Sequence, residues 1–170
     1  HPRPHLQAGD EQSLAAWRLL CAQSEKEFKG VYALLNIDPR LEVRGESFYN
    51  ARLPGTVAAL REAGVLEESE GAQCVFVEGF TNRDGSRQPL IVQKSDGGYM
   101  YSTTDLAAIS QRAVDEKAER VLYVTDAGQA QHFQQVFRAA RRAKFCADEL
   151  SLEHVPFGLV LGEVCATSRD

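Results

Sequence analysis

Polar side chains crowd the stretch SDGGYMYSTTDLAAISQR, which runs from Ser95 to Arg112. An Asp-Gly-Gly turn leads into YMYS, which is predicted to be a short aromatic strand, and a Thr-Thr-Asp step then opens a predicted helix. This corner carries two tyrosines, three hydroxyl residues and one carboxylate, although the start of a helix needs only one capping side chain. The additional polar groups are either solvated or bound to a ligand.

Polar residues also accompany two later predicted strands. Asp126, Gln129 and His132 follow the first of them, and His154 opens the second. Because ligands bind beyond the carboxyl ends of parallel strands, we expect Asp105, Asp126 and Gln129 at one rim of the sheet. Two carboxylates, a tyrosine hydroxyl and an amide at such a rim suit a cationic ligand, since a guanidinium or ammonium group would find charge-assisted acceptors there.

Each of these residues also has a structural interpretation. Thr104, Asp105 and Asp126 are suitable capping residues at helix starts. Gln129 and His132 lie three residues apart, on one helix face, and such exposed pairs are usually solvated. The sequence contains no glycine-rich phosphate loop, no G-x-S-x-G elbow and no H-E-x-x-H or other paired-histidine spacing. It therefore predicts no metal site and no nucleophile, and it gives no evidence of a nucleotide-binding loop.

Hydrophobic periodicity predicts the elements that position these residues. Trp17 and Phe28 are expected in the core, and RGESFYN (residues 44–50) is expected to be a loop or short strand. The predicted elements are a helix over about 10–35, a helix in LPGTVAALREAGVL with Gly64 as its C-cap, a hairpin over 73–93, a helix over about 104–118, a strand over 120–126, a helix over about 128–143 and a strand over 154–161. Alternating apolar strands and helices are typical of an α/β fold, with a parallel sheet covered by helices on both faces.

The composition is that of a globular chain. Its 170 residues are 44% hydrophobic and 25% charged, which is near the average and does not indicate disorder. A net charge of −5 argues against a broad basic surface for nucleic acid. The basic segment RAARRAK (residues 138–144) either complements the carbonyl end of a helix or contacts RNA.

Compartment and membrane association follow from the cysteines and the apolar runs. No apolar run is long enough to span a bilayer, and we expect no signal peptide. The four cysteines are scattered without a C-x-x-C pair. They are predicted to be reduced thiols, mostly in the core, in a cytoplasmic or organellar compartment.

Several patterns in this sequence together resemble one known family. In order and at matching spacing, Y-x-T-x-D-L-A, V-x-D-x-x-Q-x-x-H-F and H-V-x-F-G-x-V-L-G resemble the catalytic domain of arginyl-tRNA synthetase, a class I enzyme. RGESFYN and ESEGAQCVFVEGF resemble the segments that precede them. The resemblance runs from about Gly9 to Glu163. It implies a partial Rossmann-like parallel sheet of the class I synthetase type, preceded by a helical segment and a β-hairpin insertion.

The resemblance also implies roles for individual residues. Tyr101 and Asp105 match the tyrosine and aspartate that hold the substrate arginine, and Gln129 matches the glutamine that contacts the same amino acid. The implied ATP-binding residues are His132 at the active-site rim and the strand residues His154, Val155, Phe157 and Gly158. The implied ligands are L-arginine, ATP with magnesium as its substrate complex, and tRNA(Arg), without a tightly bound cofactor.

The chain departs from the family pattern in several places. The HIGH element that binds the ATP phosphates, the KMSKS-type lid and the anticodon domain have no counterpart. Residues 1–9 are interpreted as an irregular lead-in, residues 10–163 as a partial catalytic domain and residues 164–170 as a tail unlike the family. We therefore expect a fragment of arginine–tRNA ligase that has no complete catalytic set, is inactive alone and exposes apolar surface of an incomplete sheet. The alternative is a non-catalytic remnant that serves as a structural or interaction subunit in a larger assembly.

Overall fold

The computed structural model describes residues 10–158, so the expected lead-in over 1–9 and the expected tail over 164–170 lie outside the described residues. The chain divides into two compact units, His1–Val43 and Arg44–Asp170. In the first unit the described secondary structure is one helix, α2 (Glu11–Leu34). The Asp10 side chain accepts a hydrogen bond of 2.8 Å from the Ser13 amide and caps α2, as its position in the sequence predicts.

Helix α2 differs from the prediction in its packing. The helix expected over about 10–35 is confirmed, but none of its residues is buried. Trp17 and Phe28, which were expected in the core, are 38% and 55% exposed. Hydrophobic periodicity shows that a helix has an apolar face, but it does not show that another element covers that face.

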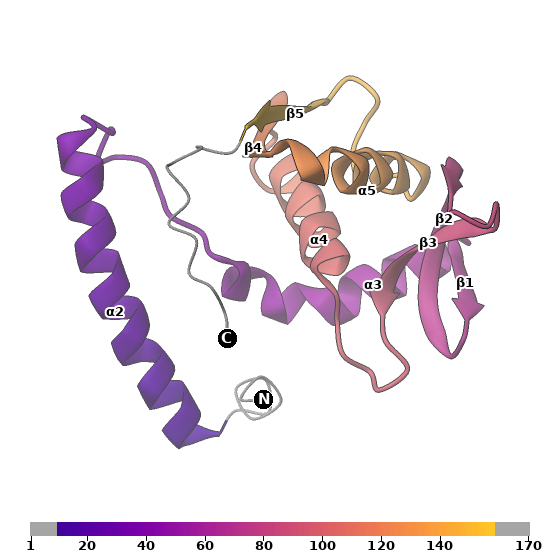
Figure 1. The fold of residues 1–170 in the computed structure, drawn as a ribbon, viewed down its shortest axis with the longest axis horizontal. Helices are drawn as coiled ribbons and strands as arrows, with labels where there is room; N and C mark the ends of the chain where they lie inside the picture. The colour runs from indigo at the N-terminus through magenta and orange to yellow at the C-terminus, as the bar shows by residue number, and fades with distance from the viewer. Residues whose placement is uncertain (1–9, 159–170) are drawn as a thin grey trace, which may run out of the picture. The chain divides into compact units, whose positions relative to one another are not determined.

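The second unit contains the remaining described elements (Figure 1). Strands β1, β2 and β3 form an antiparallel sheet, and β4 and β5 form a parallel pair. In chain order the elements are η1 (Glu46–Arg52), α3 (Leu53–Glu62), β1 (Leu66–Ser69), β2 (Ala72–Thr81), β3 (Arg87–Gln93), α4 (Tyr101–Val114), β4 (Arg120–Asp126), η2 (Ala127–Gln129), α5 (Ala130–Arg142) and β5 (Ser151–Phe157). No helix in the part of the chain that the structure describes is long and apolar enough to cross a membrane.

The hairpin expected over 73–93 is confirmed as β2 and β3, and β1 adds a third strand. Glu70 and Gly71 join β1 to β2 with φ of 52° and 77°, as in a two-residue turn of type I′. Strand β1 was not predicted because it contains Glu67 and Glu68, and glutamate is uncommon in strands. The prediction for RGESFYN is also corrected, since residues 46–50 lie in the 3₁₀ helix η1 rather than in a loop or strand.

Arginines of α5 bind the irregular part of this hairpin. The register between β2 and β3 shifts between Phe76 and Thr81, which frees carbonyl groups from the ladder. Arg142 Nη1 donates to the Phe76 carbonyl at 2.6 Å, and Arg138 Nη1 donates to the Glu78 carbonyl at 3.0 Å. Two cations of the basic segment therefore have structural partners within this unit.

The parallel strands confirm the predicted α/β alternation. Strand β4 has the predicted bounds and pairs with β5 from Arg120 opposite Ser151 to Asp126 opposite Phe157. Strand β5 begins at Ser151 instead of the predicted residue 154, and residues 159–161 of the predicted strand lie outside the described range.

The two faces of this parallel pair differ in their covering. Tyr123 and His154 face α5, where the Tyr123 ring centroid lies 4.9 Å from that of Phe133. Helices were expected on both faces, but the residues that alternate with these are exposed. Leu122, Val124, Val155 and Phe157 are 47%, 60%, 41% and 52% exposed. This confirms the expectation that an incomplete sheet exposes apolar surface.

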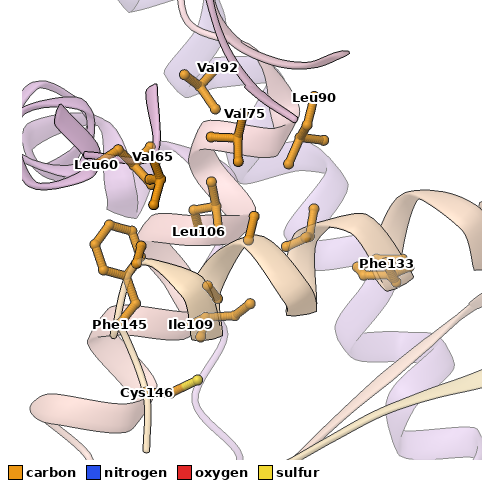
Figure 2. Close-up of a cluster of buried hydrophobic side chains, with 14 of the residues drawn as sticks. Leu60, Val65, Val75, Leu90, Val92, Leu106, Ile109, Phe133, Phe145 and Cys146 are labelled. Atoms are coloured by element: carbon orange, nitrogen blue, oxygen red, sulfur yellow. The ribbon is translucent and has the colours of Figure 1, made fainter. Parts of the chain in front are cut away.

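One core cluster joins the elements of the second unit (Figure 2). It draws side chains from α3, α4, α5 and both sheets, and its labelled members are Leu60, Val65, Val75, Leu90, Val92, Leu106, Ile109, Phe133, Phe145 and Cys146. Cys74 and Cys146 are buried, as expected, and burial raises the pKa of both thiols. Cys21 is exposed, and Cys165 lies outside the described residues.

An ion pair between β4 and β5 contributes to stability in a way that depends on pH. Arg120 Nε and Nη2 donate to the two oxygens of Glu153 at 2.8 Å, and Ser151 Oγ donates to the same carboxylate at 2.6 Å. These bonds lower the pKa of Glu153 from 4.5 to about 2, first through Arg120. Because the folded-state pKa is lowered, this contribution is fully present above about pH 4.5 and is lost as the pH falls toward 2.

We therefore expect Glu153→Gln to lower the urea midpoint of unfolding at pH 7 and to have no effect near pH 2. Urea titrations of both chains between these pH values measure the difference. Glu149→Gln is the matched control, because Glu149 is exposed and lies in the loop that precedes β5. A difference between parent and variant that does not change with pH would contradict the assignment.

Candidate functional site

The helix that carries Tyr101 and Asp105 begins earlier than predicted. Helix α4 starts at Tyr101, with Met100 as its N-cap, so YMYS does not form a strand. Thr104 and Asp105 therefore lie beyond the capping position, and the capping interpretation is wrong for both. The Thr104 amide donates to the Met100 carbonyl at 3.4 Å, so this N–H group of the first turn needs no side-chain cap.

Two of the three hydroxyl groups at this corner anchor α4 to the hairpin. Ser102 Oγ donates to the Ile91 carbonyl, and Thr103 Oγ1 donates to the Val92 carbonyl. Both residues are buried, so these bonds satisfy hydroxyl groups that burial would otherwise penalise. Part of the polar surplus noted in the sequence is therefore structural.

Tyr101 and Asp105 lie one helical turn apart, on the same face of α4. Tyr101 is 55% exposed. The Asp105 side chain is 27% exposed and its Oδ2 lies 2.7 Å from His132 Nε2 on α5. A carboxylate can only accept hydrogen bonds, so Nε2 of His132 carries the proton. The structure thus brings Asp105 and His132 together and leaves Oδ1 of Asp105 without a hydrogen bond inside residues 10–158.

Asp126 and Gln129 form a second polar pair at the carboxyl end of β4. Asp126 Oδ1 accepts from the Gly128 amide at 2.9 Å and caps η2, which confirms the capping interpretation for this residue. Asp126 Oδ2 accepts from Gln129 Nε2 at 2.6 Å. The structure gives no bond between this pair and the pair formed by Asp105 and His132.

The β5 residues assigned to ATP binding do not all lie on the same face of the strand. His154 Nε2 lies 2.9 Å from Thr125 Oγ1, and its ring stacks on Phe133 with a centroid distance of 5.3 Å. Val155 and Phe157 lie on the opposite, exposed face. Gly158 follows the strand, and a Cβ atom added there would meet nothing within 4 Å.

A buried tyrosine beside this site was not predicted from the sequence. Burial raises the pKa of Tyr123 to about 12, and the guanidinium of Arg112 opposes that shift. Arg112 Nη1 donates to the Tyr123 hydroxyl at 3.0 Å, and its Nη2 lies 3.5 Å from the Tyr49 hydroxyl. Arg112 therefore joins η1, α4 and β4 behind the site. No sequence motif marks it, because it resembles any basic residue in the last turn of a helix.

The unused polar atoms of this region are hydrogen-bond acceptors. Oδ1 of Asp105, the Tyr101 hydroxyl and Oε1 of Gln129 can each accept from an N–H group. No group of three residues suited to a metal ion occurs within the described range. A hollow lined by α3, α4 and Phe145 contains none of the predicted site residues. The acceptor atoms suit a small organic cation that carries N–H groups.

Comparisons with known proteins identify the family of this chain. The family model for tRNA synthetases class I (R), catalytic domain, matches residues 4–167. An arginine–tRNA ligase from Picosynechococcus sp. is 60% identical over 158 residues, and one from Crocosphaera subtropica is 58% identical over the same length. Each of these alignments covers 93% of this chain and 27% of the relative.

The fold agrees with solved structures. The crystal structure of arginyl-tRNA synthetase from Plasmodium falciparum superposes with a TM-score of 0.82 at 38% identity, covering 94% of this chain and 27% of that chain. A putative arginyl-tRNA synthetase from Campylobacter jejuni gives a TM-score of 0.56 at 15% identity, which shows a shared fold alone.

The fold and the family match define the class as a class I tRNA synthetase catalytic domain. Within that class, the chain belongs to the arginyl-tRNA synthetase family. It spans about a quarter of the length of the curated relatives that it matches, 27% for the two named above.

Proposed function

We propose that this chain contributes the arginine pocket and an adenosine-contacting strand to an arginine–tRNA ligase. In the complete reaction, arginine and ATP form arginyl-adenylate and pyrophosphate, and arginine then passes to tRNA(Arg). Tyr101, Asp105 and Gln129 are the proposed arginine-binding residues. His132, His154, Val155, Phe157 and Gly158 are the residues proposed to lie near ATP.

The observation that carries the proposal is the position of Asp105. Its carboxylate is half-buried, is oriented by His132 Nε2 at 2.7 Å and keeps one oxygen available. Tyr101 lies one turn away on the same helix, where its hydroxyl can accept from the same ligand. A guanidinium matches this geometry because it is planar and presents several N–H donors to neighbouring acceptors.

The residues proposed near ATP contribute in different ways. Val155 and Phe157 are exposed apolar side chains, which suit the flat face of an adenine ring. His132 and His154 both contact Phe133, with centroid distances of 5.3 Å. We assign His132 and His154 to support of the rim, and the exposed residues with Gly158 to direct contact. ATP would bring its magnesium as part of the substrate, and no residue here is assigned to the metal.

Isothermal titration of the chain with L-arginine tests the pocket, with L-lysine as the competitor. We expect saturable binding that prefers arginine, because an ammonium group cannot form the paired hydrogen bonds of a guanidinium. Circular dichroism of the same sample establishes that the chain is folded. A folded chain that gives no heat with arginine, or that binds lysine equally well, would contradict the proposed pocket.

We also propose that the chain alone does not form arginyl-adenylate. The HIGH element, which would stabilise the ATP phosphates, has no counterpart in the sequence. Arginine-dependent pyrophosphate exchange should therefore equal that of a blank without protein. Exchange above the blank, lost in Asp105→Asn, would refute this prediction.

A second proposal is that the chain serves as a non-catalytic subunit in a larger assembly. The exposed apolar side chains of Leu122, Val124, Val155 and Phe157 favour it, because such a surface usually contacts further polypeptide. Arginine-specific binding would support the first proposal over this one.

A further inference from the structure

Asp126 caps η2 and also bonds to the Gln129 side chain, and an inference from this pair rests on the proposed function. We propose that Asp126 is a positioning residue for the arginine site. It fixes the Gln129 amide with the carbonyl oxygen facing the ligand, so that Gln129 accepts a hydrogen bond from a cationic N–H group instead of donating one.

The hydrogen bonds of Asp126 determine the orientation of this amide. Oδ1 of Asp126 is occupied by the Gly128 amide at 2.9 Å, and Oδ2 lies 2.6 Å from the Gln129 side chain. An ionised carboxylate has acceptor atoms only, so the Gln129 atom that faces it must be the nitrogen Nε2. The carbonyl oxygen Oε1 is therefore on the other side of the amide, away from Asp126.

The bond matters because Gln129 is exposed. A free glutamine side chain in that environment samples many rotamers, and ordering it costs conformational entropy. It could also present either its oxygen or its nitrogen to a ligand. Asp126 removes both forms of freedom before a ligand arrives, while its bond to Gly128 keeps the turn of η2 in place.

The neighbouring charges favour a cation as the ligand of Oε1. Asp126 and Asp105 are carboxylates at this end of the unit, and His132 lies three residues beyond Gln129, close enough to share its side of the helix start. An N–H group with positive charge is attracted by both carboxylates, whereas a carboxylate of a ligand would be repelled. Because the chain belongs to a family that acts on arginine, we expect a cationic N–H group of arginine to donate to Oε1 of Gln129.

A polarity swap between positions 126 and 129 tests the proposal. Asp126→Asn keeps an oxygen for the Gly128 amide, but its NH₂ group then faces Gln129 and favours the reversed amide. Combining Asp126→Asn with Gln129→Glu restores an outward oxygen, because the glutamate can accept from that NH₂ group. The double variant also has the net charge of the parent.

We expect Asp126→Asn to weaken L-arginine binding about tenfold or more, since a charge-assisted hydrogen bond is replaced by a donor facing a donor. The dissociation constant of the double variant should be within about threefold of the parent value. The corresponding difference in binding free energy is smaller than the contribution of one hydrogen bond to a charged group. Parent affinity in the single variant would overturn the proposal. So would a folded double variant that binds as weakly as the single one, because the carboxylate introduced by Gln129→Glu should then present the acceptor oxygen that the oriented amide presents in the parent.

A measurement without arginine separates this inference from the proposed function. In a ¹⁵N-labelled parent chain, the Gln129 side-chain amide protons should resonate downfield because one of them is bonded to a carboxylate, and Asp126→Asn should remove that shift. A shifted amide in a chain that does not bind arginine would leave the positioning role supported and the proposed function refuted. An unshifted amide in a chain that binds arginine would overturn the positioning role alone.

Discussion

Asp105→Asn is expected to weaken the binding of L-arginine by about ten- to a hundredfold, which corresponds to the roughly 1.5–3 kcal/mol of a hydrogen bond to a charged group. The asparagine oxygen can still accept from His132 Nε2, which lies 2.7 Å from the carboxylate in the parent. Its NH₂ group then occupies the place of the free oxygen and opposes the donors of a guanidinium. The fold is retained while the ionic acceptor is lost.

Isothermal titration of parent and variant with L-arginine measures this effect. Asp84→Asn is the matched control, because Asp84 is an exposed carboxylate in the hairpin turn whose hydrogen bonds go to Ser86. That control removes the same unit of charge without touching the site, so it should bind arginine like the parent. An unchanged affinity in a folded Asp105→Asn chain would remove the basis for the pocket.

Phe133→Ala is expected to lower the free energy of unfolding of the second unit by about 3–5 kcal/mol, the usual cost of deleting a buried aromatic ring. Phe133 is 4% exposed, and its ring centroid lies 4.9 Å from that of Tyr123 and 5.8 Å from that of Phe137. It also contacts His132 and His154, both at 5.3 Å. The cavity would therefore remove support from both histidines at the rim as well as from the core.

Urea unfolding followed by circular dichroism measures this loss. Phe157→Ala is the matched control, because the same side chain is removed from the exposed face of the parallel pair, where Phe157 is 52% exposed. That control should cost less than about 1 kcal/mol, as is usual for a surface substitution. Equal losses in the two variants would show that Phe133 does not belong to the cooperative core.

The elements with strong periodicity were predictable from the sequence, and the local geometry at their ends was not. Strand β4 has the predicted bounds because Arg120–Asp126 is an apolar run between helical segments. The start of α4 was misplaced because polar residues look like caps in sequence, whereas Ser102 and Thr103 bond to carbonyl groups of β3, the preceding strand. Trp17 was misjudged because its burial depends on a covering element and not on its own segment.

The candidate site shows the same division between pattern and geometry. The sequence predicted that Asp126 and Gln129 lie at the end of a strand, and the structure places them there. It did not predict that Asp105 pairs with His132 or that Asp126 binds Gln129, because side chains at one rim can pair in several ways. The contact of Arg112 with Tyr123 could not be inferred either, since it depends on how α4 packs beside β4.

The two hydroxyl bonds that join α4 to β3 have a consequence for engineering this domain. They fix the end of β3 at Ile91 and Val92 to the helix that carries Asp105. The opposite end of the hairpin is an exposed turn with Gly85 at φ 83°, and such turns accept insertions well. A fluorophore or affinity tag therefore belongs in the turn at residues 82–86. The same insertion near residues 91–92 would displace the helix that carries Tyr101 and Asp105 of the proposed arginine pocket.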